Sequence, residues 1–162
     1  MRPVRTVAGV LLALAAQLLL VRLAPAGAAA AFDPFLLVVV HSALTGGERR
    51  GMLMGLACGW IQDTLFAGPV LGLTPLAKLL VGFGVGLAST RFLVAGAGPR
   101  ALVLSSAALL DVLLFERLAA LLGASVPELP LDTLALRALL AALVGAPLLG
   151  TLERRLPGEG RR

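Results

Sequence analysis

The sequence predicts an all-α integral membrane protein, a bundle of about six transmembrane helices. Hydrophobic residues make up 59% of the 162-residue chain and the mean hydropathy is +0.97, whereas 14% of the residues are charged. A soluble domain has about 25% charged residues, and a soluble fold this apolar would expose large hydrophobic patches to water. The apolar residues also form segments of roughly span length, and most arginines fall at the segment ends.

These apolar segments are expected to be helices. The first covers about residues 7–23, and the later long ones cover 51–66, 73–90, 100–122 and 133–152. The first segment also resembles an export signal, but a retained helix is favoured because the remainder is itself a membrane bundle.

A shorter segment covers residues 33–45, where Asp33 is a candidate helix cap and Pro34 suits a first helical turn. It would extend less than about 20 Å, which is short for a full crossing. We therefore expect either a short span or a broken or re-entrant element.

The arginines predict the orientation. With six spans and a cytoplasmic N-terminus, the inner ends hold ten of the 14 basic residues: Arg2, Arg5, Arg49, Arg50, Arg91, Arg100, Arg154, Arg155, Arg161 and Arg162. An excess of arginine marks cytoplasmic loops, so both termini are expected in the cytoplasm. Residues 1–152 then form a single transmembrane domain, and residues 153–162 form a short basic cytoplasmic tail. Arginines at segment ends do not make a nucleic-acid-binding face.

Groups suited to catalysis are scarce. Cys58 is the single cysteine, His41 is the single histidine, and there is no tyrosine. No Cys/His cluster has metal-ligand spacing, and most general acid–base groups are missing. We expect no catalytic, metal or cofactor site, and we hold an intramembrane enzyme to be the least favoured class.

Asp63 and Lys78 are expected to lie near the outer surface. They are almost equidistant from a predicted turn near residues 70–71, so an antiparallel helix pair would place them at similar depth. Opposite charges that face each other in lipid lower each other's cost. We expect an ion pair that locks the hairpin, in preference to a substrate or proton site. Separate snorkelling to the interface is the other structural alternative.

Small residues form two predicted faces. Gly55 and Gly59 put bare backbone on one side of the third segment, and Gly82 and Gly86 do so in the fourth. Such faces allow close approach of a second helix, although glycine is also common in membrane helices.

Asp111 lies deeper than the other acids, with Lys78 as a candidate partner and a proton relay as the less favoured reading. Arg137 is expected towards the outer surface, where exposed charges are ordinary.

The hairpin motif resembles that of the MreD family of rod shape-determining proteins. The residues that carry the resemblance are Gly55, Gly59, Asp63, Gly68, Gly72 and Leu73. Together with Lys78, Gly82 and Gly86, the motif's glycines and Asp63 are our structural and partner-binding candidates. The resemblance implies a fold like that of the substrate-binding components of energy-coupling-factor transporters.

The same resemblance implies a non-enzymatic scaffold of the bacterial cell-elongation machinery in the cytoplasmic membrane. The implied partners are MreC, the polymerase RodA with its transpeptidase and, indirectly, MreB filaments; a homodimer is left open. The competing hypothesis is a transporter subunit that binds a small vitamin-type solute near Asp63, Lys78 and Trp60.

Overall fold

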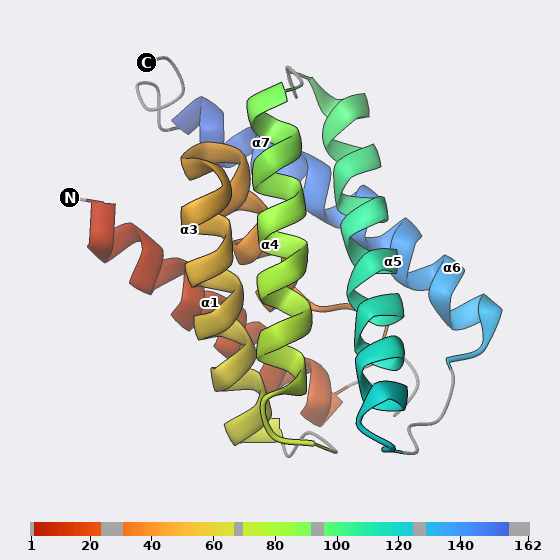
Figure 1. Ribbon diagram of the computed structural model, residues 1–162. Helices are drawn as coiled ribbons and strands as arrows, with labels where there is room; N and C mark the ends of the chain where they lie inside the picture. Colours follow the sequence, from red (N-terminus) through yellow and green to blue (C-terminus); the bar gives the residue numbers. More distant parts are fainter. Residues whose placement is uncertain (1, 24–30, 67–69, 92–95, 125–128, 156–162) are drawn as a thin grey trace.

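Most of the residues that the computed structural model describes, which are 2–23, 31–66, 70–91, 96–124 and 129–155, are helical. No strand occurs in these ranges. The helices are α1 (Arg2–Leu23), α3 (Pro34–Phe66), α4 (Leu73–Arg91), α5 (Ala97–Leu121), α6 (Leu131–Leu140) and α7 (Ala146–Arg155), with a π-helical turn η1 (Ala141–Gly145) between the last two (Figure 1). The predicted all-helical fold is confirmed.

Helix α3 is broken at Gly47, whose φ of 74° and ψ of −170° are not helical. A positive φ is readily adopted only by glycine, so Gly47 lets the chain reverse. The break divides α3 into a half-helix, residues 34–46, and a long arm, residues 48–66. Figure 1 shows the half-helix rising from mid-height and the arm returning beside α4. The half-helix has 13 residues and so extends about 20 Å, which favours the broken element over a full span.

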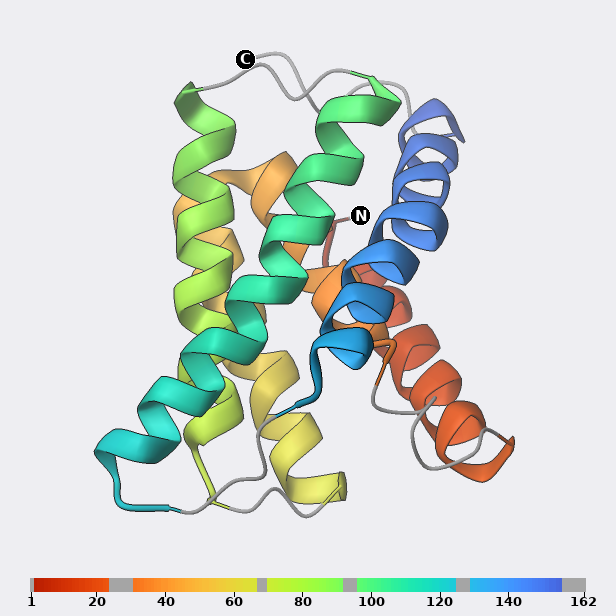
Figure 2. The ribbon, with the colours of Figure 1, turned by 90° about the vertical axis from the view of Figure 1, so that its right-hand side faces the viewer.

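The half-helix lies at the centre of the bundle. Its Leu36, Val40 and Ala43 belong to one buried apolar cluster with residues of α4, α5, η1 and α7: Val81, Val85, Leu104, Ala107, Ala108, Ala141, Ala146 and Leu149. The adjacent side of the half-helix, with Phe35 and Val39, packs with Ala13 of α1 and Cys58 of the long arm. Figure 2 shows α4, α5 and the α6–α7 helix arranged around this half-helix. The half-helix is too short to be a full span, and its apolar composition is explained by its burial among the other helices.

The long arm of α3 and α4 pack with their backbones in contact. A Cβ atom placed on Gly51 would lie 2.2 Å from the Gly82 backbone oxygen, and one on Gly55 would lie 2.2 Å from the Lys78 backbone oxygen. A Cβ on Gly86 would lie 2.4 Å from the Glu48 Cα. Only hydrogen fits at such distances. The two predicted glycine faces therefore pack within the chain, along the seam between α3 and α4.

The last helix is continuous from α6 to α7 and widens at η1. Pro147 has no N–H and its ring would crowd the preceding turn of a regular helix, and a π-helical turn next to it absorbs this disruption. Gly145 lies in this turn, where a Cβ would meet Leu37 at 2.7 Å and Leu104 at 2.8 Å. The bulge thus presents small residues to the half-helix and α5.

Many large apolar side chains face outwards along the helices, and four ionisable side chains are buried inside the bundle. Leucine side chains are exposed on α1, α4, α5 and α6, whereas Asp33, Asp63, Lys78 and Asp111 are buried. Among the described residues, three helices are long and apolar enough to cross a membrane: Thr6–Leu23, Leu73–Arg91 and Leu131–Thr151. An apolar exterior around buried ionisable groups is the distribution expected in lipid, so the fold is that of a membrane protein.

Candidate functional site

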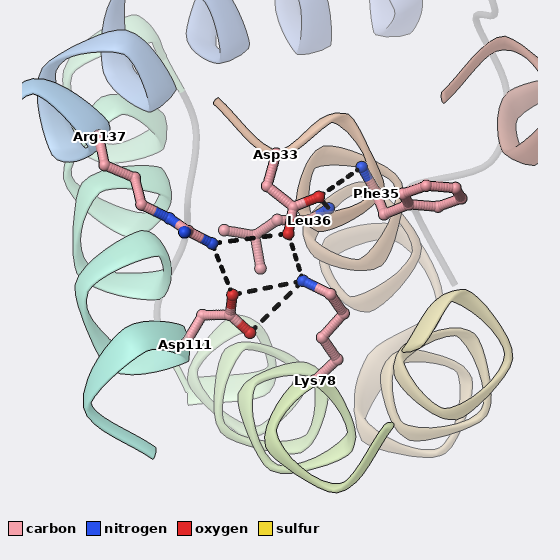
Figure 3. A network of polar contacts seen from close by, with 6 residues as sticks. All are labelled: Asp33, Phe35, Leu36, Lys78, Asp111 and Arg137. Carbon is pink, nitrogen blue, oxygen red and sulfur yellow. Dashed lines mark hydrogen bonds and ion pairs between the residues drawn. The ribbon is translucent and has the colours of Figure 1, made fainter. Parts of the chain in front are cut away.

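Four charged side chains from four separate elements meet inside the bundle. They are Asp33 before the half-helix, Lys78 on α4, Asp111 on α5 and Arg137 on α6 (Figure 3). We call them the ion cluster. Two carboxylates and two cations give it no formal net charge. Charge balance matters here, because an isolated ionised group in an apolar interior is very unfavourable.

Asp33 uses its two carboxylate oxygens for different purposes. Its Oδ1 accepts hydrogen bonds from the backbone N–H groups of Phe35, at 3.0 Å, and Leu36, at 3.3 Å. This is a helix N-cap, with Pro34 in the first turn as the sequence predicts. Its Oδ2 accepts from Lys78 Nζ and lies 3.6 Å from the Arg137 guanidinium. Asp33 therefore holds the start of the half-helix against α4 and α6.

Lys78 is at the centre of the cluster and its side chain is 1% exposed. Besides Asp33, its Nζ donates to Asp111 Oδ2 at 3.3 Å and Oδ1 at 3.5 Å. The ammonium group can donate three hydrogen bonds, and both carboxylates that it contacts are also buried. The expectation that Lys78 could be a partner of Asp111 is confirmed.

Arg137 completes the cluster from α6. Its Nη2 donates to Asp111 Oδ2 at 2.8 Å, the geometry of a charge-assisted hydrogen bond. Its side chain is 14% exposed, so the expectation of an ordinary surface charge is wrong. Because Arg137 lies in the second turn of α6, an inward orientation brings its long side chain to the same level as Asp111.

The prediction that Asp63 and Lys78 form an ion pair is wrong. Asp63 Oδ2 instead accepts a hydrogen bond from the Gly72 backbone N–H at 2.7 Å. The register of the seam gives the reason, since Gly55 faces Lys78 and Gly59 faces Pro75. Asp63 lies two helical turns beyond Gly55, about 12 Å along the axis. The hairpin is therefore centred several residues earlier than the predicted turn, and Asp63 meets the connection rather than Lys78.

The structure places most of the other predicted site residues in the hairpin. Gly55, Gly59, Gly82 and Gly86 lie in the seam, and Gly72 has a φ of 94° in the turn before α4. Gly68 lies outside the described residues. Since α4 already covers the glycine faces of the long arm, a partner helix could reach them only by displacing α4.

This geometry makes a further prediction for Asp63 and Lys78. Replacing Asp63 with alanine removes the acceptor of the Gly72 N–H and is expected to destabilise the protein by about 1–3 kcal/mol. The two residues share no partner, so the losses for Asp63→Ala and Lys78→Ala are expected to add within about 0.5 kcal/mol in the double variant. Thermal unfolding in mild detergent measures this. A double variant clearly more stable than the sum would mean that the two side chains are coupled.

The chemistry of the ion cluster suits a structural role, which is to hold the helices together. Its acids and bases are engaged with each other, and the described residues hold no group of three or more His, Cys, Asp or Glu side chains suited to a metal ion. The sequence analysis predicted the helix cap at Asp33 but missed the ion pairs of Asp33 and the inward position of Arg137. A count of the acids and bases within the apolar segments could have indicated these contacts. Each such charge is unfavourable in lipid, so each one calls for a partner of opposite charge.

The fold and the ion cluster define a class: an all-helical membrane protein whose buried charges join four elements around a half-helix. No protein-family model, curated protein or solved structure matches this chain.

Proposed function

We propose that this protein is a non-enzymatic membrane scaffold of the bacterial cell-elongation machinery. The proposal places it in the cytoplasmic membrane as a multi-pass protein of about six spans, with both termini in the cytoplasm. It rests on the resemblance of residues 55–73 to the MreD hairpin. The partners proposed are MreC, RodA with its transpeptidase and, through them, MreB filaments.

The observation that carries the proposal is the ion cluster. Each of its charges has a counter-charge inside the chain, with Lys78 contacting both acids and Arg137 contacting Asp111. Truncating one member would leave an uncompensated charge in a low-dielectric interior, so the arrangement strongly favours one assembled state. A bundle that is held in one conformation by buried ion pairs suits a scaffold protein, which keeps its partners in fixed positions.

Because the glycine faces are covered within the chain, we expect the partner to bind the outer surface of the bundle. Helix α1 packs chiefly against α3, and only 11% of its apolar span is buried. The span in α4 is 44% buried. Without α4 having to move, a single-pass partner helix can contact the outer leucines of α1 or α6. This replaces the glycine faces as the proposed surface for MreC.

The test is affinity purification of the tagged full chain from bacterial membranes in mild detergent, with mass spectrometry of the bound proteins. Recovery of MreC and the elongation polymerase is the expected result. A control is the same preparation with Lys78→Met, whose lower stability is expected to reduce the recovery of the partners. Recovery of wild-type protein without either partner would contradict the proposal.

One observation favours a second candidate, a solute-binding subunit of a transporter similar to the energy-coupling-factor type. The half-helix begins inside the bundle beside two cations, and helices interrupted in this way mark the substrate sites of many transporters. Co-purification of a transport ATPase pair would support this candidate. Thermal stabilisation by a member of a vitamin panel would identify the solute.

A further inference from the structure

One end of the bundle gathers arginines from separate helices. Glu48 packs on Gly86, where a Cβ would lie 2.5 Å from its backbone nitrogen, and Ser89 Oγ donates to the Ala43 carbonyl oxygen at 3.3 Å. These contacts align the turn of α3 with the last part of α4. Figure 1 shows the turn of α3 and the last part of α4 at the same end of the molecule, and these contacts place Arg49 and Arg91 there. We call this the basic end.

Two more arginines tie other helices to the basic end. Arg50 Nη2 donates to Thr6 Oγ1 of α1 at 3.1 Å. Arg100, in the first turn of α5, lies close to α7, with its Nη1 3.4 Å from a Cβ placed on Gly150. The basic end therefore includes parts of α1, α3, α4, α5 and α7.

Positive charges outnumber acids where the turn of α3 meets the last part of α4. Among the side chains that the structure places there, Glu48 is the one acid, against Arg49, Arg50 and Arg91. Arg49 and Arg91 are exposed, and neither has an ion-pair partner in the described ranges. The C-terminal parts of α1 and α5, which carry Arg22 and Arg117, lie towards the other end (Figure 1), and Glu116 directly precedes Arg117. The molecule thus has one end with a clear excess of positive charge.

We propose that the basic end binds the headgroups of anionic phospholipids in the leaflet around it, with Arg49 and Arg91 as the main contacts. Three helices within the described ranges are long and apolar enough to cross a membrane, so lipid phosphates are expected at the level where these helices end. Arginine presents several N–H donors in a planar fork that matches phosphate oxygens. Each basic residue near an anionic surface strengthens binding about fivefold at physiological ionic strength.

The test compares two variants that lose the same charge at opposite ends. Arg49→Gln/Arg91→Gln removes the proposed contacts, and Arg22→Gln/Arg117→Gln removes two exposed arginines from the other end. The full chain is purified in detergent micelles with a titrated phosphatidylglycerol fraction in phosphatidylcholine. Bound phosphatidylglycerol is counted by native mass spectrometry. We expect the first variant to bind phosphatidylglycerol about 25-fold more weakly than wild type, and the second to stay within about threefold of it.

Three results would overturn the proposal. Equal losses in both double variants would mean a general effect of net charge, and no loss in either would mean that no such contact exists. Displacement of phosphatidylglycerol by millimolar inorganic phosphate would assign the arginines to a free anion instead of a lipid. Thermal unfolding in phosphatidylcholine alone serves as the folding control, since all four substituted side chains are exposed and the variants are expected to unfold like wild type.

Discussion

Replacing Lys78 with methionine is expected to destabilise the folded protein by about 3–5 kcal/mol, the usual cost of breaking a buried ion pair from one side. Methionine has a similar length and an apolar side chain, so the main change is the loss of the ammonium group. Asp33 and Asp111 would then share only Arg137, and one negative charge would remain uncompensated. Lys78 is 1% exposed, so water cannot replace the lost counter-charge.

The effect is measured by thermal or denaturant unfolding of the purified protein in mild detergent. Leu80→Met on the same helix is the matched control, because Leu80 is partly exposed and is expected to change stability by less than about 0.5 kcal/mol. Adding Asp111→Asn to Lys78→Met restores charge balance between Asp33 and Arg137. The double variant is therefore expected to be more stable than the single one. A single variant as stable as wild type would mean that the cluster does not hold the bundle together.

The sequence predicts the helices well because lipid imposes a simple condition on composition. Apolar stretches of span length must form helices that satisfy their own backbone hydrogen bonds, and residues 73–90 and 100–122 closely match α4 and α5. The cap at Asp33 is also local, since it depends on the next three residues. The break falls at the second glycine of the Gly46-Gly47 pair, and the short length of residues 33–45 had left the form of that segment open.

The ion cluster could not be derived in the same way because its members lie far apart in the chain. Lys78 is 45 residues from Asp33 and 33 from Asp111, and their meeting depends on how the helices are ordered in space. The pairing of Lys78 with Asp63 was predicted from a hairpin centred near residues 70–71. The glycine contacts move that centre, so Lys78 faces Gly55 and its side chain reaches a different acid.

Replacing Gly55 with leucine is expected to separate α3 from α4 and to destabilise the protein by about 3 kcal/mol or more. A Cβ at this position would lie 2.2 Å from the Lys78 backbone oxygen and 2.5 Å from its carbonyl carbon. Both atoms belong to the backbone, so no rotation of a side chain can relieve the clash. The displaced turn of α4 also carries the Lys78 side chain, so the same substitution disturbs the ion cluster.

Gly84→Leu is the matched control on α4. Gly84 is exposed, and a Cβ there meets nothing within 4 Å. Leucine also has a better helix propensity than glycine by about 0.8 kcal/mol, so this variant is expected to be as stable as wild type or slightly more stable. If Gly55→Leu were tolerated as well as Gly84→Leu, α3 and α4 would not be in backbone contact. The long-arm glycines would then be free to bind a partner helix, and the proposed MreC surface would return to them from the outer leucines of α1 and α6.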